Sequence, residues 1–131
     1  MTARTWTLGP MEGRTLTANR RPHWTYRAAV TKEWRELAWG LAREQRIPRL
    51  ERARIVVHWL PADRGRRDPN NVAPMSKAIT DGLVDAGVLD DDDATRLDGP
   101  DHRLGPVTPP TRRRELARNT TVLLVTITEA A

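Results

Sequence analysis

The run Thr120–Glu129 near the C-terminus, T-T-V-L-L-V-T-I-T-E, constrains the fold more than any other segment. Its apolar residues point to both faces of an extended chain, with Leu123, Val125 and Ile127 on one face and Val122 and Leu124 on the other. This pattern is typical of a strand that is buried on both sides of a sheet. The segment 53–60, A-R-I-V-V-H-W-L, is rich in β-branched residues and predicts a second, central strand.

Two other segments carry the spacing of an amphipathic helix. Apolar residues recur at steps of three and four within 26–44 and again within 72–86. The first stripe comprises Val30, Trp34, Leu37, Ala38 and Leu41, and the second comprises Val72, Met75, Ile79, Leu83 and Ala86. Asp68 or Asn71 is suited to cap the start of the second helix, and Gly87 is suited to end it.

The remaining elements are weaker. A short strand is expected at 5–8, where Gly9-Pro10 stops it, and a weak strand at 94–98. We expect a surface loop at 11–24. Beyond Asp93 we expect irregular chain up to the last strand, apart from the weak strand at 94–98. The sequence therefore predicts one α+β domain over 1–131. Its small mixed β-sheet has about four strands and is packed by two amphipathic helices in the order β-α-β-α-β-β.

Composition excludes several classes of protein. The chain has no cysteine, which rules out disulfides, thiolate metal sites and cysteine nucleophiles. No window approaches the roughly 18 apolar residues that a membrane-spanning helix needs, and the N-terminus lacks the pattern of a signal peptide. We expect a cytoplasmic protein without membrane contact, either bacterial or acting in the host cytoplasm if it is encoded by a phage.

Charge is distributed unevenly along the chain. The segment 63–93 contains eight of the 17 acidic residues and four of the 22 basic residues, which gives it a local formal charge of −4. The rest of the chain has 18 basic and nine acidic residues, or +9. An acidic centre in a basic protein is expected when carboxylates hold a divalent cation while the surroundings hold a polyanion.

Arginine dominates the positive charge, because only Lys32 and Lys77 are lysines. The planar guanidinium suits contacts with phosphate. The residues that we expect to bind DNA are Arg14, Asn19, Arg20, Arg21, Arg64, Arg66, Arg67, Arg112, Arg113 and Arg114. The first four lie in the segment 11–24 with His23 and Trp24, a composition that fits contact with a DNA backbone or an unpaired base. A solvated loop with Trp24 anchored in the core explains the same residues equally well.

Asp68 and the run Asp90–Asp93 offer oxygen ligands of the kind that favour Mg²⁺ or Mn²⁺ over zinc. They flank the second predicted helix, whose ends are about 20 Å apart. They meet if the chain around Asp68 folds back, or if the run returns beside the strand at 53–60. Lys77 could neutralise a phosphate there, or it could pair with Asp81 on the helix surface. The run also fits a solvated acidic turn.

Three motifs resemble the RusA family of Holliday-junction resolvases, particularly its phage and prophage members. They are R-R-D-P-N-N at 66–71, K-A-I-T-D-G-L-V-D-A-G-V-L-D-D-D-D at 77–93, and L-L-V-T-I-T-E at 123–129. The resemblance implies a homodimer of small α+β subunits. It also implies binding to four-way DNA junctions and paired incisions by Mg²⁺-dependent aspartates.

By this resemblance, the catalytic residues are Asp68, Lys77 and Asp91. Asp90 and Asp92 remain alternative metal ligands, because a run of four aspartates leaves the register open. Asn70 stands where the family pattern D-x-D-N has a second aspartate, so we expect weaker metal binding.

Three functions follow from these motifs as hypotheses. The first is a Mg²⁺-dependent endodeoxyribonuclease that cleaves branched DNA. The second is a weakened or inactive branched-DNA-binding protein of the same fold. The third is a basic interaction module with a solvated acidic loop.

Overall fold

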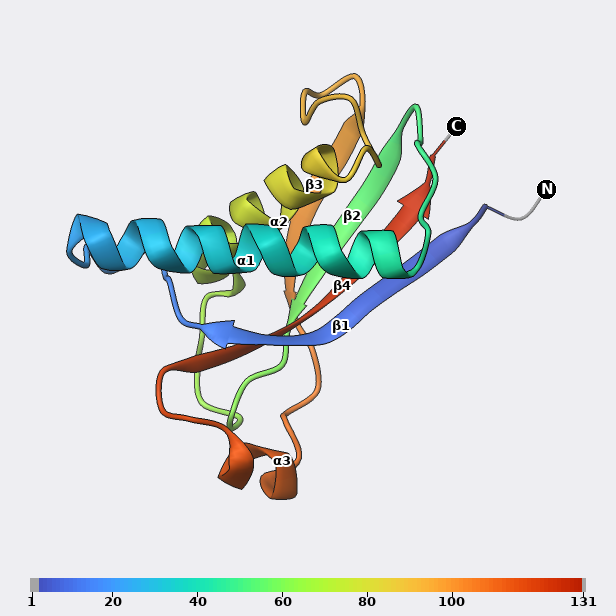
Figure 1. The fold of residues 1–131 in the computed structure, drawn as a ribbon. Coiled ribbons are helices and arrows are strands. Elements are labelled where there is room, and N and C mark those ends of the chain that lie inside the picture. Colours follow the sequence, from blue (N-terminus) through green and yellow to red (C-terminus); the bar gives the residue numbers. More distant parts are fainter. Residues whose placement is uncertain (1–2, 131) are drawn as a thin grey trace.

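The computed structural model describes residues 3–130 and shows a four-stranded mixed sheet with three α-helices (Figure 1). The chain runs through β1 (Thr5–Arg14), α1 (Trp24–Glu44), β2 (Ala53–Trp59), the 3₁₀ helix η1 (Pro69–Val72), α2 (Ala73–Asp85), β3 (Leu97–Leu104), α3 (Pro110–Glu115) and β4 (Thr120–Glu129). The predicted α+β class and the order β-α-β-α-β-β are confirmed. The six-residue helix α3 was not predicted.

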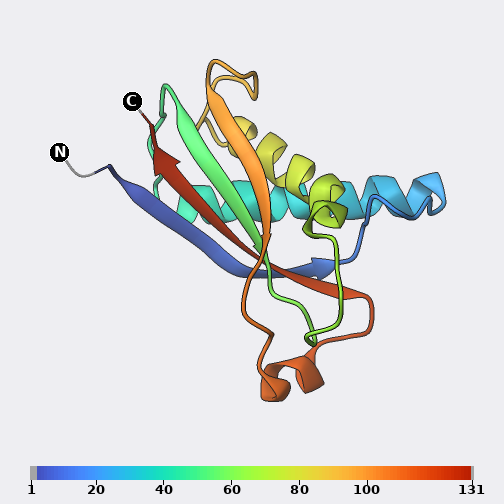
Figure 2. The same cartoon turned by 180° about the vertical axis from the view of Figure 1, so that it is seen from behind.

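The strands lie in the order β1-β4-β2-β3. β4 pairs antiparallel with both β1 and β2, whereas β2 and β3 are parallel. α1 and α2 cover one face of this sheet, and the view from behind shows the other face without them (Figure 2). β4 is therefore a central strand, but the expectation that it is buried on both sides is only partly correct. Leu123, Val125 and Ile127 are fully buried under the helices, while Leu124 on the other face is half-buried.

Both edge strands are longer or differently placed than predicted. β1 continues to Arg14, and β3 spans 97–104 instead of 94–98. In each strand a Gly-Pro pair lies inside the strand, beside a shift in the pairing register. Gly9-Pro10 was expected to end the first strand, and that expectation is wrong. Proline is tolerated at a sheet edge because its missing N–H removes no ladder bond. Gly9 and Gly99 adopt φ angles of 111° and 108°, a conformation that accommodates the bulge at low cost.

The two helices pack as their apolar stripes predict, with a shift in α1. Val30, Trp34 and Ala38 are buried as expected, and Ala42 joins them, while Leu37 and Leu41 are only partly buried. α1 begins at Trp24, where Nδ1 of His23 accepts a hydrogen bond from the N–H of Thr25 at 3.2 Å. In α2, Met75, Ile79 and Leu83 are buried, and Gly87 with φ 81° ends the helix as predicted.

None of the helices in the described residues 3–130 is both long enough and apolar enough to cross a membrane.

Arginine–carboxylate pairs hold neighbouring elements together and give folding a pH dependence. Arg35 of α1 donates to Asp85 of α2 at 2.8 Å, and Arg112 of α3 donates to Glu12 of β1 at 2.6 Å. Each arginine, chiefly through its hydrogen bonds, lowers the pKa of its carboxyl partner. A carboxyl group with a lowered pKa in the folded state stabilises the fold above its unfolded pKa. This contribution is lost as the pH falls through the folded pKa.

We therefore expect the melting temperature to stay nearly constant from neutral pH to about pH 5 and to fall below about pH 4. Thermal unfolding followed by circular dichroism across this range measures the effect. Because these pairs are partly exposed, the effect of any one pair is small and decreases with added salt. A protein that becomes more stable on acidification below pH 4 would contradict the prediction.

Candidate functional site

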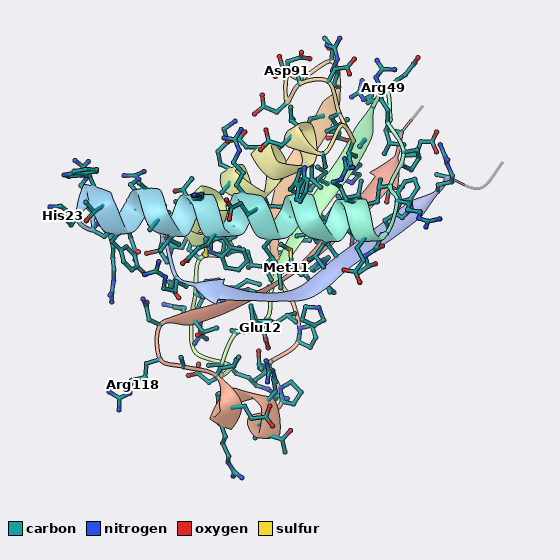
Figure 3. All side chains as sticks on the ribbon, viewed as in Figure 1. Met11, Glu12, His23, Arg49, Asp91 and Arg118 are labelled. Carbon is teal, nitrogen blue, oxygen red and sulfur yellow. The ribbon has the colours of Figure 1, made fainter. Side chains whose placement is uncertain are left out.

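The aspartate run lies in the loop between α2 and β3. Val88 and Leu89 are both buried, and the N–H of Leu50 donates to the carbonyl of Val88 at 2.7 Å, which fixes where the loop leaves the helix. Figure 3 places Asp91 in this loop, at the end of the molecule opposite α3. Buried apolar residues thus anchor a loop whose acidic side chains reach solvent.

The four aspartates of the run have different partners. Asp90 pairs with Arg49, whose Nε donates at 2.9 Å. Asp93 accepts from the N–H of Thr95 at 2.9 Å and pairs with Arg96 at 3.0 Å, so it closes the turn that leads into β3. Asp92 contacts Lys77, and Asp91 accepts a hydrogen bond from the N–H of Asp92 at 2.7 Å. Asp90 and Asp93 therefore hold the loop in place through arginines, and Asp92 holds it through Lys77. Within residues 3–130, the side chain of Asp91 forms no ion pair.

Lys77 connects this loop to the middle of α2. Its Nζ donates to Asp81 at 3.0 Å, the predicted helix-surface pair, and it also contacts Asp92. The hydrogen bond with Asp92, followed by that with Asp81, raises the pKa of Lys77, and Lys77 in turn lowers the pKa of Asp92. Both groups are charged at neutral pH. The loop thus folds back from Gly87 along α2, far enough for Asp92 to meet the side chain of Lys77.

Asp68 and Asn70 lie at the other end of α2, and both are exposed. Asp68 caps η1, because its Oδ1 accepts a hydrogen bond from the N–H of Asn70 at 2.9 Å. The Oδ1 of Asn70 lies 3.3 Å from Nδ1 of His102 on β3. An amide oxygen can only accept, so this contact is a hydrogen bond in the tautomer of His102 that carries the proton on Nδ1.

The oxygen donors at both ends of α2 fit a hard cation such as Mg²⁺ in their chemistry. Within residues 3–130, however, no three or more His, Cys, Asp or Glu side chains are grouped closely enough to hold a metal ion. Asp68 with Asn70 forms one pair of donors, Asp91 with Asp92 forms the other, and Lys77 lies between them along the helix.

Two residues near these donors were missed at the sequence level. His102 lies in the part of β3 that was interpreted as irregular chain, and burial lowers its pKa, which keeps it neutral at neutral pH. Arg49 lies in a loop, two residues after the buried Ile47. Nothing in the sequence around Arg49 indicated that it pairs with an aspartate of the run 90–93. An extension of the third strand through its edge proline would have placed His102 beside the start of η1.

The arginines expected to bind DNA fall into two groups. Some are held by the protein itself: Arg14 pairs with Glu33, Arg67 with Asp63, Arg112 with Glu12 and Glu115, and Arg113 donates to the carbonyl of Ala62. Within the described chain, no ion pair is formed by Arg20, Arg21, Arg64, Arg66 and Arg114. The second group is available for phosphates without breaking a contact.

The exposure of Trp24 decides against one of the two interpretations of the segment 11–24. The interpretation with Trp24 anchored in the core is wrong, because 73% of Trp24 is exposed at the start of α1. The segment is also not entirely loop, since its first residues belong to β1. Met11 and Leu16, rather than Trp24, are buried and attach the segment to the core.

No family model matches this chain, and no curated protein matches it. The likeness to the RusA family thus depends on the three motifs in the sequence.

Proposed function

We propose that this protein is a Mg²⁺-dependent, structure-specific endodeoxyribonuclease that cleaves branched DNA such as Holliday junctions. Mn²⁺ is expected to replace Mg²⁺. The observation that carries the proposal is the contact between Lys77 and Asp92. It places a cation suited to a phosphate against Asp92, next to the exposed Asp91, in a chain of net charge +5. This combination favours a phosphodiester substrate over a small neutral one.

The metal ligands in this proposal are Asp68, Asn70, Asp91 and Asp92, without Asp90. The two pairs of donors are separate in the structure, so one Mg²⁺ ion held by all four residues would require the pairs to approach each other. An ion held in this way would activate water and neutralise the charge that develops on the scissile phosphate. Lys77 shares its charge between Asp81 and Asp92 in the structure. A phosphate that displaces one of these carboxylates would take up that charge, so Lys77 would stabilise the bound strand.

The arginines without ion pairs would track the backbones of the DNA arms. Symmetric cleavage of two strands requires two equivalent sites, so a two-fold homodimer is part of the proposal. The protein would act in recombination, repair or phage DNA processing, in the cytoplasm of a bacterium or of a phage-infected host.

The test uses a synthetic four-way junction and a linear duplex of the same sequence, each with Mg²⁺, with Mn²⁺ or with EDTA. We expect paired incisions in the junction with either metal and none with EDTA. Absence of any incision would contradict the nuclease. Junction-selective binding without incision would instead support the inactive branched-DNA-binding protein, and equal binding to junction and duplex would support a basic interaction module.

The alternative function, an inactive protein that binds branched DNA, is favoured by the presence of an asparagine at position 70. The Asn70 amide offers a metal ion an oxygen that carries no charge. Replacing Asn70 by aspartate is expected to lower the Mg²⁺ concentration needed for cleavage by about tenfold, the lower end of what changes around a metal produce. The new carboxylate keeps an oxygen that accepts from His102. A Mg²⁺ titration of the cleavage rate measures the change, and an unchanged or weaker Mg²⁺ dependence would contradict it.

A further inference from the structure

A groove of about 560 Å³ opens beside the start of η1. The chain between β1 and α1 forms one wall, held in place by the hydrogen bond from the N–H of Ala18 to the carbonyl of Asn71 at 3.1 Å. The N–H of Thr15 donates to the carbonyl of Asn119 at 2.9 Å and closes the other side. Its polar lining consists chiefly of Asn19, Arg20, His23, Tyr26, Asn71 and Asn119.

One wall of the groove is rigid. The hydroxyl of Tyr26 donates to the carbonyl of Thr15 and accepts from Nδ2 of Asn119, both at 2.7 Å. The guanidinium of Arg14 lies over the Tyr26 ring, 5.2 Å from its centroid. A wall fixed in this way loses little conformational entropy when a ligand binds.

Other lining groups are free to contact a ligand. Within residues 3–130, the side chains of Arg20 and Asn71 make no hydrogen bond or ion pair, and Asn19 uses only its oxygen, which accepts from Thr17 at 2.7 Å. Amide groups and a guanidinium match the donors and acceptors on the edge of a nucleobase, and the guanidinium also suits a phosphate.

Trp24 supplies an aromatic surface next to this groove. Its ring stacks on the ring of His23, a groove residue, with centroids 5.8 Å apart and an interplanar angle of 30°. Figure 3 shows His23 at the exposed N-terminal end of α1. Trp24 contributes little to the core, so packing does not account for a large aromatic residue at this position. Stacking on a partner from outside the protein does account for it.

We propose that this groove receives one unpaired nucleotide of a DNA strand, with Trp24 stacked on a base. The groove adjoins the candidate site, since Asn71 lines it and directly follows Asn70. Paired bases are already stacked inside a duplex, so Trp24 and the amide groups can reach only a base that has left the helix. The inference rests on the proposed function for the origin of that nucleotide, the branch point of a junction.

The test compares Trp24→Ala with Trp39→Ala in EDTA, where no strand is cut. Trp39 is a matched control, because it is 44% exposed on the same helix and lies about 22 Å further along it. Fluorescence anisotropy measures binding to labelled oligothymidine and to a blunt duplex. We expect Trp24→Ala to weaken oligothymidine binding about tenfold and Trp39→Ala to leave it unchanged. Neither substitution is expected to change the affinity for blunt duplex.

The proposal is overturned if both substitutions weaken oligothymidine binding equally, if neither does, or if Trp24→Ala weakens duplex binding to the same extent. Thermal unfolding of both variants shows that each remains folded. Because binding is measured without metal, a wild type that binds through Trp24 but cuts no junction would disprove the nuclease and leave the groove assignment standing. If the wild type cuts the junction but Trp24→Ala leaves oligothymidine binding unchanged, the nuclease stands and the groove assignment is disproved.

Discussion

Replacing Asp92 by asparagine is expected to lower the rate of Mg²⁺-dependent junction cleavage at least about 100-fold, the effect typical of removing one electrostatic group from a catalytic site. Asp92 is the member of the run that contacts Lys77, so its carboxylate lies beside the group proposed to hold the phosphate. Asp68→Asn is expected to cause a similar loss. Single-turnover cleavage at saturating protein separates this loss from weaker DNA binding.

Asp90→Asn is the matched control for this prediction. The substitution is chemically the same and lies two residues away, but Asp90 is paired with Arg49 instead of Lys77. We expect cleavage within about twofold of the wild type and a slightly lower melting temperature, because an exposed pair contributes little to stability. If Asp90→Asn is as inactive as Asp92→Asn, the choice of Asp92 rather than Asp90 as a metal ligand is wrong.

The sequence could predict the helices and the central strands, because their patterns report burial directly. Val57 in β2 and Val125 in β4 pair in the middle of the sheet and are both fully buried. The bounds of the edge strands β1 and β3 were predicted less accurately. A Gly-Pro pair normally stops a strand, and only the position of β1 and β3 at the edges allows it inside them.

The sequence could predict which residues make up the candidate site, but not which of them contact one another. The charge inversion located Asp68, Lys77 and the run, since clustered carboxylates are visible in any sequence. Which aspartate meets Lys77 depends on how Val88 and Leu89 anchor the loop, and that packing involves residues distant in the chain. His102 was missed for the same reason, because only the pairing of β3 with β2 brings it to Asn70.

Adding a single methyl group at Gly82 is expected to destabilise the fold by forcing two packed helices apart. A Cβ atom at this position would lie 2.3 Å from the carbonyl oxygen of Arg35 and 3.0 Å from Cβ of Ala38, both on α1. The obstacle is backbone, so α1 and α2 would have to move apart. We expect Gly82→Ala to lower the free energy of unfolding by about 1–3 kcal/mol, as overpacking does. Urea denaturation measures it.

Gly40→Ala is the control that separates packing from helix propensity. Gly40 also lies inside a helix, α1, but a Cβ atom there would have no neighbour within 4 Å. Alanine reduces the conformational entropy of the unfolded chain and favours the helix, so this variant is expected to gain about 0.5–1 kcal/mol. Opposite signs for the same substitution would show that close approach of the helices, rather than helix propensity, requires glycine at 82. Stabilisation by Gly82→Ala would mean that α1 and α2 are further apart than the structure shows.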